Sequence, residues 1–170
     1  MGIKQHNGNT KADRLAELKI RSPSIQLIKY GAIGLNAIIF SPLLIAADLG
    51  SQNGTNITIS DGDRITGDTA DPSGNLYGVM TPAGNTPGNI NLGNDVTVNV
   101  NDASGYAKGI IIQGKNSSLT ANRLTVDVVG QTSAIGINLI GDYTHADLGT
   151  GSTIKSNDDG IIIGHSSTLT

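Results

Sequence analysis

The sequence predicts an all-β protein, folded as a right-handed parallel β-helix or β-solenoid, and three observations carry the prediction. A phrase of glycine followed by apolar residues recurs at Gly78, Gly109, Gly136 and Gly160, at intervals of 24 to 31 residues. After residue 47, short apolar alternations are separated by Gly, Asn, Asp and Ser, as in strands and turns. With 23 glycines and 3% aromatic residues, the core is expected to consist of stacked Ile, Val and Leu.

The first element in the chain is a leader over residues 1–47. Residues 1–30 carry six Lys or Arg and two acidic residues, and the apolar run 31–47 ends on two alanines. A basic region, an apolar region and small residues, in that order, are typical of an extended signal peptide. A short accessory helix is expected over residues 10–20. Cleavage is expected in the region that contains Ala46, Ala47 and Asp48.

A retained membrane anchor is the alternative interpretation of this leader. Its apolar run is about 17 residues long, which is the short limit for a helix that spans a bilayer. The run also contains Asn36, Ser41 and Pro42. These features favour a signal that is removed over an anchor that is kept.

The body of the chain, residues 48–170, is acidic, with twelve Asp and only five Lys or Arg. The basic residues are scattered singly, without interleaved aromatic rings, so a nucleic-acid partner is not expected. The chain contains no cysteine, which excludes disulfides and thiolate catalysis.

Intervals of 24 to 31 residues fit one coil of a parallel β-helix, so about five coils are expected over residues 48–170. A second phrase, in which Leu precedes Gly, occurs at Asp48-Leu49-Gly50, Asn91-Leu92-Gly93 and Asp147-Leu148-Gly149. The Pro-rich and Gly-rich segment 71–88 is expected to be the longest insertion and to project from the rod.

Alternation within the strands predicts which side chains face the core. In 96–100 and 124–128 every second residue is apolar, so these side chains are expected inside and their polar neighbours outside. In the triple-isoleucine runs 110–112 and 161–163 the outer two are expected inside. The middle isoleucine of each run then covers a neighbouring loop or forms an adhesive patch.

These patterns resemble the passenger domains of bacterial type V autotransporters, of the pertactin-like and adhesin-like group. The resemblance rests on the leader 1–47, the change to Gly/Asn/Thr-rich sequence and the coil phrases. It implies export by Sec-type machinery, passage through an outer-membrane β-barrel translocator outside this chain, and a surface-exposed or secreted β-helical stalk. Adhesion, aggregation or virulence is the implied role, with a host surface or self-association as partner. Residues 48–170 are expected to be N-terminal coils of a longer passenger, truncated within a repeat and left with an uncovered strand edge.

Two acidic segments were weighed as calcium sites. Asp61-Gly62-Asp63 resembles half of a calcium loop, but the remaining acidic ligands are missing, so a plain turn is favoured. Asn157-Asp158-Asp159-Gly160 is also favoured as a turn, because Asn, Asp and Gly tolerate left-handed backbone. His145 and His165 lack the spacing of a zinc motif. No metal or cofactor is expected.

One acidic residue, Asp127, lies within a convincing strand, and Arg123 is the basic residue nearest to it in sequence. Polysaccharide cleavage by a β-helical carbohydrate-active enzyme would use acidic residues on adjacent coils. Outward-facing solubilising residues explain the two side chains as well. The favoured function is a non-enzymatic stalk or adhesin without catalytic residues; the alternatives are such an enzyme or an inactive fragment.

Overall fold

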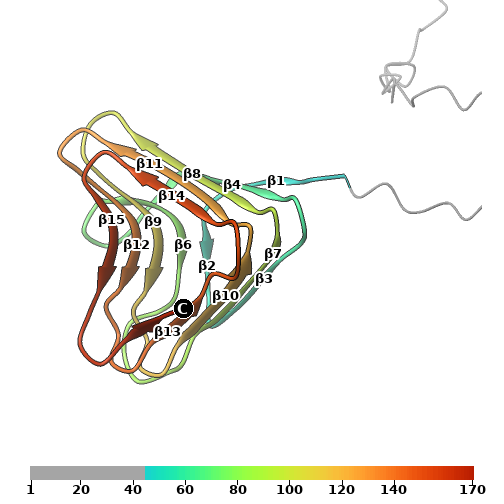
Figure 1. Cartoon of the computed structure of the whole chain (residues 1–170). Helices are drawn as coiled ribbons and strands as arrows, with labels where there is room; N and C mark the ends of the chain where they lie inside the picture. The colour runs from blue at the N-terminus through green and yellow to red at the C-terminus, as the bar shows by residue number, and fades with distance from the viewer. Residues whose placement is uncertain (1–44) are drawn as a thin grey trace, which may run out of the picture. The chain divides into compact units, whose positions relative to one another are not determined.

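A computed structural model describes residues 45–170, and in that range the chain forms sixteen β-strands and no α-helix (Figure 1). The leader and the accessory helix expected over residues 10–20 lie outside the described residues, except for residues 45–47. Within 45–170, no helix has the length and hydropathy needed to cross a membrane. The strands are β1 (Asp48–Leu49), β2 (Gln52–Asn53), β3 (Asn56–Ile59), β4 (Arg64–Gly67), β5 (Thr69–Ala70), β6 (Leu76–Met80), β7 (Asn89–Asn94), β8 (Thr97–Asp102), β9 (Tyr106–Ile112), β10 (Ser118–Asn122), β11 (Thr125–Gly130), β12 (Ser133–Leu139), β13 (His145–Asp147), β14 (Thr153–Ser156), β15 (Asp159–Ile163) and β16 (Thr168–Leu169).

Fifteen of these strands form three parallel sheets that surround one core. Sheet A has the order β1-β4-β8-β11-β14, sheet B the order β2-β6-β9-β12-β15, and sheet C the order β3-β7-β10-β13-β16. Each coil contributes one strand to each sheet in turn, as Figure 1 shows. The remaining strand, β5, pairs antiparallel with β6. The prediction of an all-β parallel β-solenoid is therefore confirmed.

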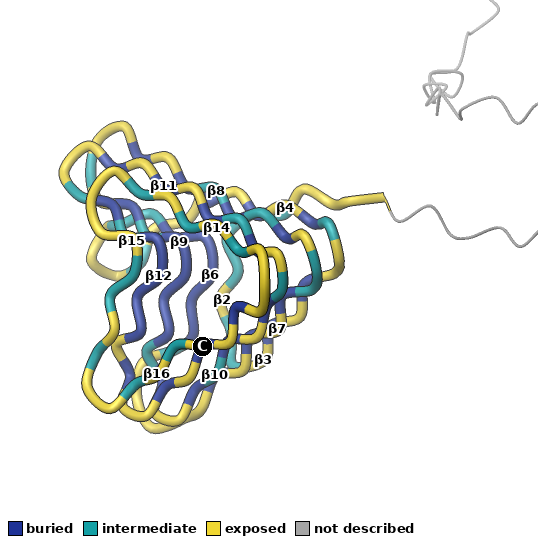
Figure 2. The backbone as a smooth tube through the Cα atoms, viewed as in Figure 1, coloured by how far each residue is buried: buried dark blue, intermediate teal, exposed yellow. Residues whose placement is uncertain are grey.

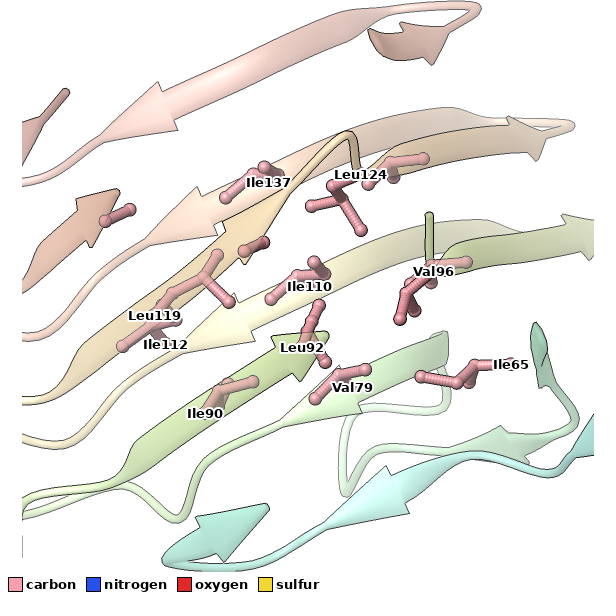
Figure 3. Packing of buried hydrophobic residues seen from close by; sticks show 14 of the residues in the cluster. Ile65, Val79, Ile90, Leu92, Val96, Ile110, Ile112, Leu119, Leu124 and Ile137 are labelled. Atoms are coloured by element: carbon pink, nitrogen blue, oxygen red, sulfur yellow. The ribbon is translucent and has the colours of Figure 1, made fainter. Parts of the chain in front are cut away.

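The register of sheet A repeats every 28 residues in the middle coils. Thr97 pairs with Thr125, and Thr125 pairs with Thr153. Because the repeat is an even number of residues and the strands alternate, inward positions stack on inward positions. The valines and leucines of 96–100 and 124–128 are at most 1% exposed, which confirms the alternation. All of them belong to the main core, and Figure 3 shows two of them, Val96 and Leu124, beside isoleucines and leucines of sheets B and C.

The recurring glycines form one column on the inner side of sheet B. Gly78, Gly109, Gly136 and Gly160 lie at matching positions of β6, β9, β12 and β15. A Cβ atom on Gly109 would lie 2.6 Å from Val126 Cγ1 and would also collide with the carbonyl oxygen of Gly136. Only glycine allows sheet B to bend this close to sheet A at Gly78, Gly109 and Gly136. Gly160, on β15, has no atom within 4 Å of such a Cβ.

The corners between sheets also lie at equivalent positions of successive coils. The residue two places before each of β4, β8, β11 and β14 has a positive φ, which turns the chain from sheet C into sheet A. The corresponding residue before β10, β13 and β16 does the same between sheets B and C. Left-handed backbone is uncommon for residues other than glycine, so its recurrence here identifies these residues as the ones that set the corners. The corner residues are Gly62, Asp95, Arg123 and Gly151 in the first set, and Asn116, Tyr143 and Ser166 in the second.

The phrase in which Leu precedes Gly has no fixed place in the coil, because Asn91-Leu92 and Asp147 lie in sheet C, whereas Asp48-Leu49 lies in β1 of sheet A. One sequence prediction was wrong. Segment 71–88 does not project as one loop, because it contains β6, in which Val79 is fully buried. Its only hairpin is the turn between β5 and β6.

The triple-isoleucine run 110–112 behaves as predicted. Ile110 and Ile112 belong to the main core, while Ile111 points out of sheet B and packs with Tyr77 and Met80 in a second, smaller cluster. Ile111 therefore covers a neighbouring segment. The run 161–163 lies on β15 at the edge of sheet B, where Figure 2 shows weaker burial than on β9 or β12. Ile163 is accordingly 47% exposed.

Candidate functional site

The outer face of sheet A carries a groove of about 340 Å³, called here the sheet A groove. It crosses β4, β8 and β11, whose parallel register brings outward side chains from three coils into line. Thr66, Asn99 and Asp127 occupy one such line and are followed on β14 by Lys155. The groove is lined by Arg64, Thr66, Gly67, Asn99, Val100, Asn101, Asp127 and Val129.

Arg64 is the cation of the sheet A groove. With the Asn99 amide oriented so that its oxygen faces β4, Arg64 donates to that oxygen from Nε at 3.2 Å and from Nη2 at 2.8 Å. This contact joins residues of two adjacent coils that are 35 positions apart in the chain. The pairing of Arg64 with Asn99 can be recognised only once the register of β4 and β8 is known, which explains why sequence reasoning missed Arg64.

Asp127 and Arg123, the pair considered for the alternative enzyme, are not brought together in this groove. Arg123 lies at the corner before β11 and donates from Nε and Nη2 to the two carboxylate oxygens of Asp95, both at 2.7 Å. The hydrogen bonds from Arg123 lower the pKa of the Asp95 carboxyl below its usual value. Asp127 is left as the single carboxylate of the sheet A groove, whereas hydrolysis of a glycosidic bond generally uses two.

The first acidic segment considered as a calcium site, 61–63, forms a hydrogen-bonded turn, whereas the second, 157–160, is a bend that continues into β15 at Asp159. Asp61 accepts hydrogen bonds from the backbone and side-chain nitrogens of Asn94 at 2.7 and 3.1 Å, and the backbone bond lowers the pKa of Asp61. In the second segment, Asn157 bonds to the backbone of Gly130, and Asp158 accepts a hydrogen bond from Ser133. The side chains of both segments therefore form hydrogen bonds to neighbouring coils.

The histidines are also separated. His145 Nδ1 lies 2.8 Å from Thr168 Oγ1 on the outer face of sheet C, and His165 lies between β15 and β16. Across residues 45–170 no three His, Cys, Asp or Glu side chains converge as a metal site.

The hairpin between β5 and β6 holds an ion pair that sequence reasoning missed. Lys108 Nζ donates to Asp71 Oδ2 at 3.2 Å, and both side chains are largely buried. Burial raises the pKa of Asp71, but hydrogen bonds from Asn75 and Lys108 outweigh it, so the net pKa lies below the usual value. The hairpin is thereby fixed to the next coil, beside a cavity of about 230 Å³ that Ile111 and Ile140 also line.

The residues expected around the signal cleavage site lie at the start of the described chain. Ala46 and Ala47 precede β1, and Asp48 begins it. The Ala47 backbone nitrogen donates to Asp63 Oδ1 at 2.8 Å, and the Ala47 carbonyl accepts from the Arg64 backbone nitrogen at 2.8 Å. Ala47 is therefore part of the first coil, and its partner Asp63 was not identified from the sequence as more than a turn residue.

Comparison with known proteins gives two curated relatives over the whole chain. The chain is 98% identical over 170 residues to a protein named probable autotransporter YcgV from Escherichia coli (strain K12), and spans 18% of its length. It is 97% identical to a putative uncharacterized protein YcgV from Escherichia coli O157:H7, and spans 31% of that protein. No family model and no solved structure matches. The resemblance drawn from the leader and the repeats agrees with the name of the first relative: the chain is similar over its whole length to part of a longer protein named a probable autotransporter, and it spans less than a third of either relative.

Proposed function

We propose that residues 48–170 are the first coils of an exported autotransporter passenger and act mechanically, as a rigid stalk in adhesion or self-association. The observation that carries the proposal is the uninterrupted stacking of strands from β1 to β16 around one apolar core. Such a stack is rigid along its axis, because each coil is fixed to the next by backbone hydrogen bonds in three sheets. The role of the segment is then to support other parts of the passenger and to space them apart.

Export and display complete the proposal. The leader directs the chain to Sec-type machinery and is removed by cleavage in the region of Ala46, Ala47 and Asp48, and a translocator in the outer membrane passes the passenger to the cell surface or the medium. The autotransporter name of the relative supports this route, as does the order of basic, apolar and small residues in the leader. The passenger segment itself is proposed to be non-enzymatic.

A carbohydrate-active enzyme is the second candidate, and the sheet A groove is the observation that favours it. Arg64, Asn99 and Asp127 present a cation, an amide and a carboxylate in one groove of a size that a small ligand fills. A single carboxylate leaves the acid and base roles of glycosidic hydrolysis without a pair. We therefore rank this candidate second.

Deletion of one coil separates the two candidates. Removal of residues 97–124 from the matching segment of the Escherichia coli K12 relative joins Val96 to Thr125 and leaves every ladder in register, because these residues are one full 28-residue repeat. Surface amount and adherence are then compared with those of the intact protein. A stalk keeps both, since the shorter rod still stacks.

The same deletion removes β8, and with it Asn99, Val100 and Asn101, from the sheet A groove. Loss of adherence or of a glycan-cleaving activity at unchanged surface amount would therefore contradict the stalk. The matched substitution Asp127→Asn removes the groove carboxylate without changing the coil number. It is expected to leave adherence unaltered, and loss of glycan cleavage in this variant would establish the enzyme instead.

A further inference from the structure

Asp63 is a buried acid that has only neutral partners in the described chain. Its side chain is 8% exposed at the turn between β3 and β4. Oδ1 accepts a hydrogen bond from the Ala47 backbone nitrogen at 2.8 Å, and Oδ2 accepts one from the Ser60 backbone nitrogen at 3.2 Å. Neither ion pair within residues 45–170 includes Asp63. A buried carboxylate is usually paired with a cation, because desolvation of the charge is costly.

We propose that the missing cation is the α-ammonium group of Ala47, created when the leader is cut between Ala46 and Ala47. In that step an exported-protein endopeptidase uses one water molecule. The amide bond between the Ala46 carbonyl carbon and the Ala47 nitrogen breaks, the carbon takes the hydroxyl of the water, and the nitrogen takes the remaining water proton together with the proton that the new carboxyl releases, which leaves a carboxylate on Ala46 and an ammonium on Ala47. No redox change occurs. The inference rests on the proposed export and deepens it by naming the processing site.

The geometry favours this bond over the next one. Cleavage before Ala47 keeps the nitrogen that already lies 2.8 Å from Asp63 Oδ1 and turns its contact into a charge-assisted hydrogen bond. It also keeps the Ala47 carbonyl, which accepts from the Arg64 backbone nitrogen. A chain that begins at Asp48 loses both contacts. Ala47 is solvent exposed, so the remaining ammonium protons reach water.

The sequence alone does not choose between these bonds. A cut on either side of Ala47 leaves an alanine as the last residue of the leader, and a large aliphatic residue, Leu44 or Ile45, two places before it. The contact between the buried Asp63 carboxylate and the Ala47 nitrogen distinguishes the two bonds. In the processed protein Asp63 then acts as the anchor of the N-terminus on the first coil.

The first test is the N-terminus of the exported protein. The whole chain, with its leader, is produced in a Gram-negative host, recovered from outside the inner membrane, and analysed by intact mass and N-terminal sequencing. A chain that begins at Ala47 is the expected result. A chain that begins at Asp48 or elsewhere overturns this inference while leaving export intact. A chain that is neither exported nor cut contradicts the proposed function as well.

The second test is the reactivity of the α-amine. An acylating reagent near pH 7 attacks the α-amine in preference to lysine, because the α-amine titrates at a lower pH. Pairing with Asp63 should slow this reaction about tenfold relative to Asp63→Asn, a factor that corresponds to one charge-assisted hydrogen bond. The matched control is Asp102→Asn, which changes another buried Asp bonded to neutral donors, at Ser104. It should react like the wild type.

A comparison without substitutions covers the case in which Asp63→Asn does not fold. The wild-type α-amine is acylated in the folded chain and in the urea-unfolded chain. Slower reaction in the folded chain, by about the same tenfold factor, is expected. Equal rates in the two states, or equal rates in a folded Asp63→Asn variant and the wild type, overturn the inference.

Discussion

Gly109→Ala tests the glycine column of sheet B, because one methyl group is placed where two neighbouring segments already touch the backbone. The new Cβ would lie 2.6 Å from Val126 Cγ1 and 2.9 Å from Val128 Cγ2, and it would collide with the Gly136 carbonyl oxygen. The carbonyl belongs to the next strand and is fixed in the ladder between β9 and β12. Relief of the collision therefore requires a shift of the backbone and not of a flexible side chain.

The cost follows from this overpacking. Insertion of a methyl into a close-packed interior costs about 1–3 kcal/mol, and a backbone collision places this case near about 3 kcal/mol. With a urea m-value of about 2 kcal/mol/M, the midpoint of unfolding should fall by roughly 1.5 M. Urea titrations followed by far-UV circular dichroism measure this shift.

Gly160→Ala is the matched control, since it makes the same change at the equivalent position of β15, where no atom lies within 4 Å of the new Cβ. This variant should be neutral, or more stable by up to about 1 kcal/mol, because alanine restricts the unfolded chain. Equal losses in the two variants would refute the steric argument and indicate a general preference for glycine in sheet B. No loss in Gly109→Ala would show that the coils are not in the described register.

Three further changes test the ion pairs and corners. Lys108→Met leaves the largely buried Asp71 without its cation, and the free energy of unfolding should fall by about 1–3 kcal/mol in urea titrations; an unchanged midpoint contradicts this. Arg123→Gly loses only an exposed ion pair and relieves a φ of 52°, so it should equal or exceed the wild type in stability while Arg123→Ala does not. The pKa values of Asp95 and Asp61 lie below their usual value, because Arg123 and the Asn94 backbone donate to them. Their stabilisation is present above about pH 4 and lost as the pH falls through the folded pKa, so stability should decrease below that pH; an acid titration without this decrease contradicts the assignment.

The repeat itself was readable from the sequence, because a parallel stack places equivalent residues at equivalent positions. The glycine phrase identified sheet B in four successive coils, and the alternation in 96–100 and 124–128 identified the core face of sheet A. Both signals are local, with periods of two residues or one coil. Both signals remain recognisable when the corners differ in length, because a corner changes only the spacing between strands.

The parts that were missed depend on contacts between coils. Arg64 and Asn99 meet only because β4 and β8 pair, and the spacing of their coils differs from that of the later ones. Segment 71–88 was taken as one loop because Pro and Gly frame its buried strand β6, so turn residues obscured the period of two. The left-handed corner at Arg123 carries no sequence signal, since Arg is not a residue that favours this backbone.

Cysteine accessibility on intact cells tests the central claim that this segment is a folded stalk outside the cell. The chain has no cysteine, so single cysteines placed in the matching segment of the Escherichia coli K12 relative report one position each, with the unsubstituted protein as background. Asp127→Cys lies on the exposed outer face of β11, and Val126→Cys lies beside it in the core at 0% exposure. A membrane-impermeant maleimide should label Asp127→Cys on intact cells and Val126→Cys only after denaturation. Labelling of Asp127→Cys only after lysis, or equal labelling of both positions on intact cells, would contradict the displayed β-solenoid.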